Sequence, residues 1–85
     1  MKSYSVVYLS EAEEELVSIW EMAADRAAIA GAANRADKLL ADSPRNQSVF
    51  LGEDLWRLEV PPLRFYFIIR DDDRIVEISN VIEAR

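Results

Sequence analysis

The sequence predicts an α+β domain in which a strand and a two-helix hairpin precede a three-stranded antiparallel sheet, with the helices packed on one sheet face. Three observations support this fold class. Apolar residues alternate between positions 55 and 82, apolar residues recur at helical spacing between positions 10 and 42, and two short breaks divide the C-terminal segment. A chain of 85 residues without cysteine is expected to form a single domain spanning residues 1–85.

The N-terminal part predicts a strand followed by a helix. Residues 4–9 alternate as a strand does, and they are expected to pair with the C-terminal sheet because a lone strand is not stable. Ser10 and Glu13 have the spacing of a capping box, which predicts a helix start. The acidic residues that follow are interpreted as a solvated helix face rather than a metal site. The predicted buried stripe consists of Ala12, Leu16, Ile19, Trp20 and Ala23.

A second helix is predicted over residues 28–42, because apolar and alanine positions recur there at helical spacing. The break at Asp25-Arg26 favours a helical hairpin, although one long bent helix fits the same pattern. Ser43 precedes Pro44 and is therefore expected to end the helix. The polar connection over 45–54 has room for a short strand at 48–50.

The C-terminal segment predicts strands at residues 55–60, 63–70 and 74–82, the last with apolar residues on both faces. Pro61-Pro62 excludes an ordinary tight hairpin turn, which leaves a wider loop or a turn with a cis peptide bond. The wider loop is preferred, because about 5–6% of X–Pro bonds in folded proteins are cis. Residues 71–73, three aspartates, are expected to form a turn.

The predicted sheet has a polar cluster on the face away from the helices. If Val60 pairs with Leu63, Glu59 lies opposite Arg64 and Arg57 opposite Tyr66. These four side chains are suited to phosphate binding and proton transfer. A simpler interpretation is that Glu59 and Arg64 form a cross-strand ion pair and that Tyr66 packs as an ordinary aromatic residue.

Composition narrows the possible chemistry. The absence of histidine and cysteine removes the usual zinc, haem and thiol sites, so no metal or cofactor is expected. The net charge of −6 argues against long-range attraction to nucleic acid or to an anionic membrane. No apolar run approaches the ~18 residues of a membrane span. A soluble, cytoplasmic protein is expected.

The chain resembles the RelE/ParE superfamily of bacterial toxins from type II toxin–antitoxin modules, which includes plasmid-stabilisation proteins. The resemblance covers nearly the whole chain and is stronger in element order than in any single motif. It implies a compact toxin fold, a flexible antitoxin partner, and either ribosome-dependent mRNA cleavage or inhibition of DNA gyrase. The matching stretches are SEAEEELVSIWEMAADR, AANRADKLLADSP, LWRLEV and LRFYFIIRDDDRIVEISNV.

The resemblance also implies catalytic roles. Arg57 matches a phosphate-holding position, and Arg64 the arginine that stabilises the transition state. Glu59 is a candidate general base, Tyr66 a candidate general acid, and Arg85 stands where the family's nucleases usually have a basic residue or histidine followed by tyrosine. The alternative is a catalytically inactive interaction or dimerisation module with the same fold, and a homodimer is compatible with either.

Overall fold

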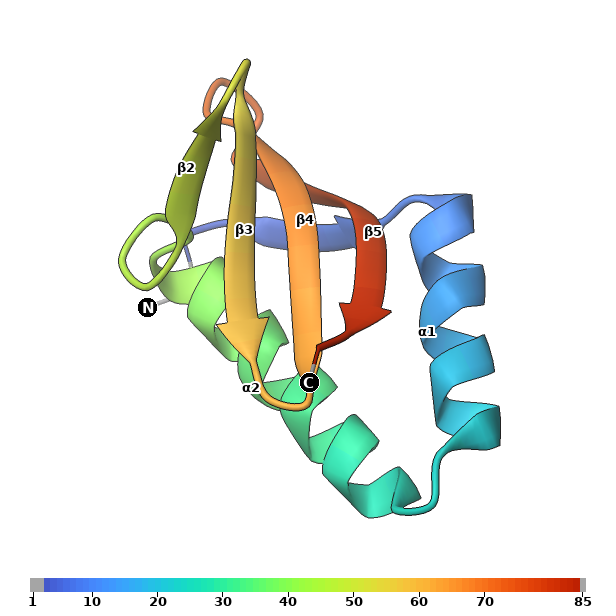
Figure 1. The fold of residues 1–85 in the computed structure, drawn as a ribbon. Helices are drawn as coiled ribbons and strands as arrows, with labels where there is room; N and C mark the ends of the chain where they lie inside the picture. Colours follow the sequence, from blue (N-terminus) through green and yellow to red (C-terminus); the bar gives the residue numbers. More distant parts are fainter. Residues whose placement is uncertain (1–2, 85) are drawn as a thin grey trace.

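The computed structural model describes residues 3–84, which form two helices and one five-stranded sheet (Figure 1). The α+β class is confirmed. The sheet has two strands more than the three predicted for its C-terminal part, because both flanking strands join it. The elements are β1 (Ser5–Tyr8), α1 (Ser10–Met22), α2 (Arg26–Asp42), β2 (Val49–Gly52), β3 (Leu55–Val60), β4 (Leu63–Arg70) and β5 (Ile75–Glu83).

The strand order is β1-β5-β4-β3-β2. β1 runs parallel to β5, whereas β5, β4, β3 and β2 pair antiparallel in turn. Both helices pack on the same face: α1 lies alongside β5, and α2 crosses behind β3 and β4 (Figure 1). The opposite face of the central strands is therefore left open, as the sequence predicts.

Both helices begin close to the predicted positions, but the N-cap of α1 differs from the prediction. α1 begins at Ser10, yet Leu9 is its N-cap residue and no side chain caps it; the Glu13 N–H donates to the Leu9 carbonyl at 3.0 Å. The capping-box prediction is wrong because Ser10 is already helical, one position too late for an N-cap. α2 begins at Arg26, two residues earlier than predicted, where the Asp25 carboxylate accepts from the Ala28 N–H at 3.1 Å.

The link between β3 and β4 is tighter than predicted. The Pro61-Pro62 peptide bond is cis, and Val60 pairs directly with Leu63, so the preference for a wider loop is wrong. The Pro62 carbonyl accepts from the Ala84 N–H at 2.8 Å, which ties the turn to the end of β5. The predicted aspartate turn joins β4 to β5.

A bulge in β5 explains its unusual apolar pattern. Tyr66 pairs with Asn80 and Phe67 with Ile78, so Ser79 is the extra residue in the register, and its hydroxyl donates to the Tyr66 carbonyl of β4 at 3.3 Å. The extra residue reverses the alternation, and Val81 is buried although simple period-two counting puts it on the other face from Ile78.

One hydrophobic core lies between the sheet and the two helices. Its largest fully buried side chains are Phe65 and Phe67 of β4, and small alanines on α1 and α2 allow the helices to approach the sheet closely. Among residues 3–84, no helix is long and apolar enough to cross a membrane.

Candidate functional site

Four polar side chains share the open face of β3 and β4. The predicted register is confirmed: Arg57 pairs with Tyr66, and Glu59 pairs with Arg64. Leu58 alternates with them and is buried on the helix side. The alternation of strand residues therefore directs these four side chains away from the core.

Glu59 bridges the two arginines of this site. Its Oε2 lies 3.3 Å from Nη2 of Arg64, and its Oε1 lies 3.8 Å from Nε of Arg57. The arginine side chains are about 30% exposed and Glu59 is 46% exposed, so solvent and ligands reach the cluster. Two guanidinium groups against one carboxylate leave a local charge of +1 on a chain whose net charge is −6.

The groups around Arg64 favour its charged form, and one N–H of each arginine in the site has no hydrogen-bond acceptor in the described part of the chain. The Tyr66 hydroxyl, followed by the Glu59 carboxylate, raises the pKa of the Arg64 guanidinium above its ordinary value. The Nε atoms of Arg57 and Arg64 are buried and have no hydrogen-bond partner within residues 3–84. A buried donor without an acceptor is unfavourable. An oxyanion would contact the exposed part of the two arginine side chains, which are about 30% accessible.

The structure thus brings together Arg57, Glu59, Arg64 and Tyr66, whereas Arg85 lies outside the described residues. Sequence reasoning missed the role of Glu15. Its carboxylate accepts from the Val81 N–H at 2.8 Å, next to the β5 bulge, and so connects α1 to β5. An acidic residue on a helix flank gives no sequence signal for such a contact.

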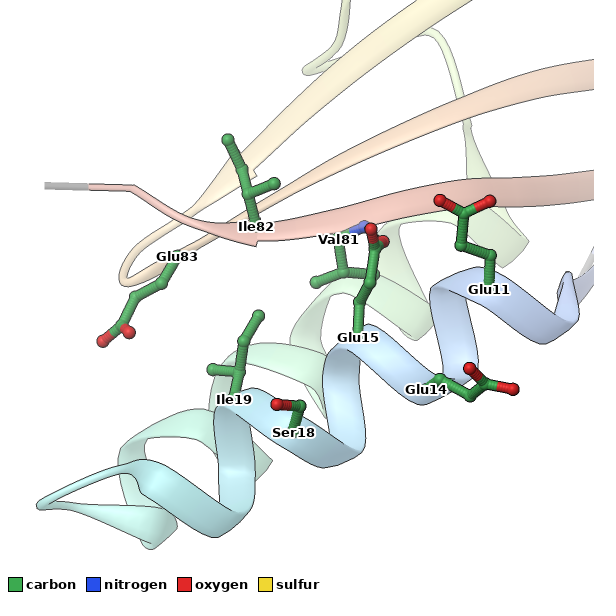
Figure 2. Close-up of a pocket in the computed structure, with 8 residues that line it drawn as sticks. All are labelled: Glu11, Glu14, Glu15, Ser18, Ile19, Val81, Ile82 and Glu83. Atoms are coloured by element: carbon green, nitrogen blue, oxygen red, sulfur yellow. The ribbon is translucent and has the colours of Figure 1, made fainter.

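A hollow of about 510 Å³ lies on the surface where α1 packs against the end of β5 (Figure 2). Four carboxylates line it together with apolar side chains from both elements. Figure 2 shows Glu11 and Glu14 projecting from α1 and Glu83 from the end of β5. This side of the molecule is acidic, in contrast to the arginine pair on the open face.

An apolar groove of about 200 Å³ runs between the two helices. Trp20 is 41% exposed and Val17 is 49% exposed along it, although Trp20 belongs to the predicted buried stripe. The Arg26 guanidinium lies 4.4 Å from the centre of the Trp20 ring and fixes its position. The lining residues are Leu16, Val17, Trp20, Ile29, Ala30 and Ala33.

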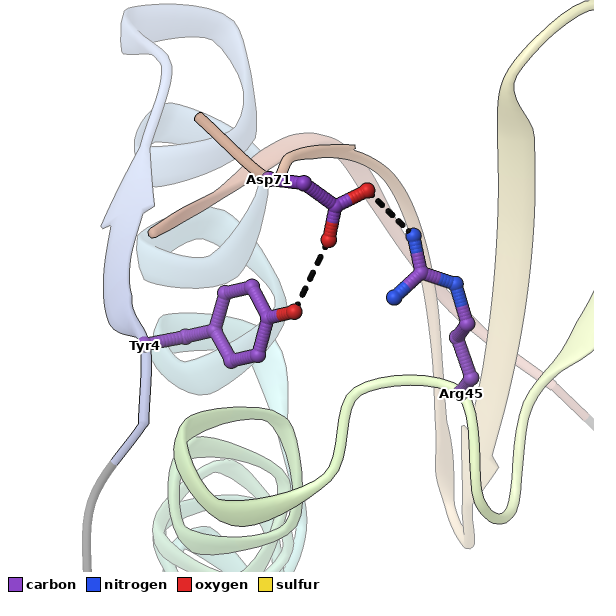
Figure 3. A network of polar contacts seen from close by, with 3 residues as sticks. All are labelled: Tyr4, Arg45 and Asp71. Carbon is purple, nitrogen blue, oxygen red and sulfur yellow. Dashed lines mark hydrogen bonds and ion pairs between the residues drawn. The ribbon is translucent and has the colours of Figure 1, made fainter. Parts of the chain in front are cut away.

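A polar network fastens three distant segments together (Figure 3). The Tyr4 hydroxyl donates to Asp71 at 2.8 Å, and Arg45 donates to the other oxygen of that carboxylate at 2.7 Å. Arg45 and Tyr4 lower the pKa of Asp71 below its ordinary value. The network holds the start of β1, the loop after α2 and the β4–β5 turn in place.

Comparison with known proteins identifies the fold. No family model and no curated protein matches the sequence. The RelBE2 toxin–antitoxin complex of Mycobacterium tuberculosis contains a chain that aligns with a TM-score of 0.81 and 19% identity, over 98% of this chain and 93% of that one. The isolated E. coli RelE toxin aligns with a TM-score of 0.70 and 17% identity, over 96% of this chain and 85% of that one.

A chain of the chromosomal ParDE system of P. aeruginosa is also similar, with a TM-score of 0.71 and 12% identity, over 98% of both chains. These similarities confirm the resemblance at the level of the fold. The chain has the RelE/ParE fold along essentially its whole length.

Proposed function

We propose that this chain is the toxin component of a type II toxin–antitoxin module and cleaves mRNA in the cytoplasm. The observation that supports this most strongly is the convergence of Arg57, Glu59, Arg64 and Tyr66 on the open face of a RelE/ParE-fold sheet. Two cations can bind a phosphodiester, while a carboxylate can accept the proton of the ribose 2′-hydroxyl and a phenol can donate one to the leaving 5′-oxygen.

In the proposed reaction, Glu59 takes the proton of a ribose 2′-hydroxyl. The 2′-oxygen then attacks the adjacent phosphorus, and the bond from phosphorus to the 5′-oxygen breaks. Tyr66 donates its proton to that leaving oxygen, so the products are a 2′,3′-cyclic phosphate and a 5′-hydroxyl. Arg64 stabilises the charge on the phosphorane oxygens, and Arg57 holds the phosphate.

Substrate binding would also release the base. In the free chain, Glu59 lies between both guanidinium groups, at 3.3 Å and 3.8 Å. A phosphodiester competes for the paired arginines because its two non-bridging oxygens share a negative charge and accept bidentate hydrogen bonds, and a second charge develops on these oxygens in the phosphorane. Once the phosphate takes over these contacts, the carboxylate is free to accept a proton from the 2′-hydroxyl.

The overall charge favours an mRNA that is already held in place. A net charge of −6 repels free RNA, while the arginine pair attracts phosphate locally. The ribosome would overcome this repulsion by presenting the message at high effective concentration. This is consistent with a ribosome-dependent nuclease.

The proposed antitoxin would dock on the groove between α1 and α2. The groove is apolar along its floor, and Trp20 and Val17 offer exposed surface to the apolar side of a partner helix. Solved structures of similar fold include the RelE–RelB complex of Pyrococcus horikoshii, which aligns with a TM-score of 0.71 and 15% identity over 95% of this chain and 94% of that chain.

The test is induction of the chain alone in a bacterial host, with growth followed and mRNA ends mapped beside an Arg64→Ala variant of confirmed fold. Growth arrest with new mRNA ends that vanish in the variant supports the proposal. Growth arrest without new mRNA ends would indicate a different target, such as DNA gyrase. Unaffected growth with folded protein would favour the non-catalytic interaction module.

A further inference from the structure

A hollow of about 470 Å³ adjoins the candidate site at the end of β3, and we call it the α2–β3 hollow. Arg35 and Lys38 line it from α2, and Gln47 lines it from the loop before β2. Glu59 lines it from β3 and also contacts both arginines of the candidate site, at 3.3 Å and 3.8 Å. Because Glu59 belongs to both, the hollow is continuous with the candidate site.

The end of β3 leaves the way open between the candidate site and the hollow. The pairing of β2 with β3 covers residues 55–57 of β3, so Glu59 and Val60 extend beyond β2. Figure 1 shows α2 crossing behind this end of β3. An extended ligand on the open face can therefore pass Glu59 at the edge of the sheet and reach α2.

The two cations of the hollow are available to an anion. Both side chains are exposed, and within residues 3–84 neither Arg35 nor Lys38 makes an ion pair or a side-chain hydrogen bond. On a chain with a net charge of −6, these two cations and the arginine pair of the candidate site concentrate positive charge around one carboxylate. This local charge favours an anionic ligand that spans both parts. The other cations of the described segment are ion-paired or lie over an aromatic ring; they are Arg26, Arg45, Arg57, Arg64, Arg70 and Arg74.

The remaining lining of the hollow fits a nucleobase. Leu39, Val60 and Pro61 supply apolar surface against which a flat ring can pack. The Gln47 amide can donate and accept hydrogen bonds at the edge of such a ring. Inorganic phosphate would use the cations alone and leave the apolar surface uncovered. Cations, apolar surface and an amide together match a nucleotide.

We propose that the α2–β3 hollow binds the nucleotide whose 2′-hydroxyl attacks, and that Arg35 and Lys38 hold the next phosphate on its 5′ side. The direction follows from Glu59, because the group that accepts the proton of the 2′-hydroxyl lines the hollow. Tyr66, the proposed acid, lies on β4, so the leaving nucleotide extends the other way across the sheet. The inference rests on the proposed function, and it makes Gln47 the determinant of base preference at this position.

Binding of the full chain to a dinucleotide and to a trinucleotide of RNA tests this assignment. Both carry 2′-O-methyl groups, so neither is cleaved, and fluorescence anisotropy measures their affinities at several salt concentrations. The wild type should bind the trinucleotide on the order of tenfold more tightly, because its additional phosphate reaches the hollow. The double variant Arg35→Gln with Lys38→Gln should lose this gain and still bind the dinucleotide as the wild type does. For the trinucleotide, its slope of log affinity against log salt should be shallower by about 0.7, the value for one phosphate contact on a single strand.

The matched control is the double variant Arg70→Gln with Arg74→Asn. These two residues lie at the opposite end of β4, by the β4–β5 turn, and asparagine tolerates the positive φ of 56° at position 74. Both double variants change the net charge from −6 to −8, since each removes two positive charges. The control should keep the trinucleotide gain. Equal losses in the two double variants would assign the gain to net charge and overturn the hollow as a site.

Photo-cross-linking tests the direction of the RNA chain. With 4-thiouridine as the 5′ nucleotide of the trinucleotide, cross-links should map to α2 or to the loop that carries Gln47, and the same label at the 3′ end should not reach them. A wild type that gains nothing from the third nucleotide, or that cross-links the hollow from the 3′ end, would overturn this subsite while mRNA cleavage on ribosomes persists. A wild type that binds neither oligonucleotide and cleaves no mRNA would overturn the proposed function, and the subsite with it.

Discussion

Glu59 has two opposing effects in the proposed mechanism, because it partly neutralises the two arginines proposed to hold the phosphate and is also the proposed base. Glu59→Gln should therefore bind a short RNA oligonucleotide a few-fold more tightly, since the competing carboxylate is gone. The same variant should lose about 10²–10⁴-fold in cleavage rate, the usual contribution of a general base. Oligonucleotide binding and single-turnover cleavage on ribosomes measure the two effects separately.

The matched control is Glu53→Gln, which removes an exposed carboxylate from the β2–β3 turn and should change neither quantity. A Glu59→Gln variant that cleaves within a few-fold of the wild-type rate would remove Glu59 from the mechanism. The ion pair with Arg64 would then be its whole role.

Glu15 makes a stabilising contact between α1 and β5 that no sequence pattern predicted. Its half-buried carboxylate accepts from the Val81 N–H at 2.8 Å and from the Asn80 side chain at 3.3 Å. Glu15→Ala should reduce the free energy of unfolding by about 1–3 kcal/mol, because a backbone N–H at the bulge loses a charged acceptor. Glu14→Ala, on the exposed side of α1, should change it by less than about 0.5 kcal/mol. Urea unfolding of both variants makes the comparison, and equal losses would contradict a specific role for Glu15.

At the scale of the elements, the alternation of apolar residues predicted the main strands, and their recurrence at helical spacing predicted both helices. They also predicted the pairing of Arg57 with Tyr66 and of Glu59 with Arg64, because Val60 and Leu63 flank the prolines symmetrically. The β5 bulge was not predictable, since it depends on which residue of β5 lies unpaired beside β4. The isomer of the Pro61-Pro62 bond was not predictable either, because both forms fit the sequence.

The β4–β5 turn gives a prediction about pH. The folded pKa of Asp71 is lowered by Arg45 and Tyr4, so the stabilisation it provides is present above the unfolded pKa and is lost as pH falls through the folded pKa. Asp71→Asn should therefore be less stable than the wild type near neutral pH, and the difference should shrink in acid. Thermal unfolding between neutral and strongly acidic pH measures this.

The neighbouring Asp72→Asn is the control, because Asp72 is exposed in the same turn. The thermal stability of Asp72→Asn should depend on pH in the same way as that of the wild type. If Asp71→Asn differs from the wild type by the same amount at every pH, the Asp71 network in Figure 3 does not contribute through its charge.

For the whole molecule, the distribution of charge bears on how the RNA of the proposed reaction would approach. The sequence did not predict that acidic residues gather in the hollow between α1 and β5 while the arginine pair lies on the open face. These positions depend on how α1 packs against the sheet. The chain carries −6 overall, and this field opposes the approach of a polyanion before the local arginines act.

Neutralising the hollow should therefore accelerate RNA binding without altering the site. Replacing Glu11, Glu14 and Glu83 with glutamine changes the net charge from −6 to −3, since three carboxylates are removed. The association rate for a short RNA should rise a few-fold at low ionic strength, because long-range repulsion falls, and the gain should fade as salt screens the field. The dissociation rate should stay unchanged, since Arg57 and Arg64 still make the contacts.

Stopped-flow fluorescence at several salt concentrations measures both rates. The control is the triple aspartate variant, which keeps the net charge of the wild type. An association rate that is insensitive to the glutamine changes at low salt would mean that the arginine pair alone governs the encounter.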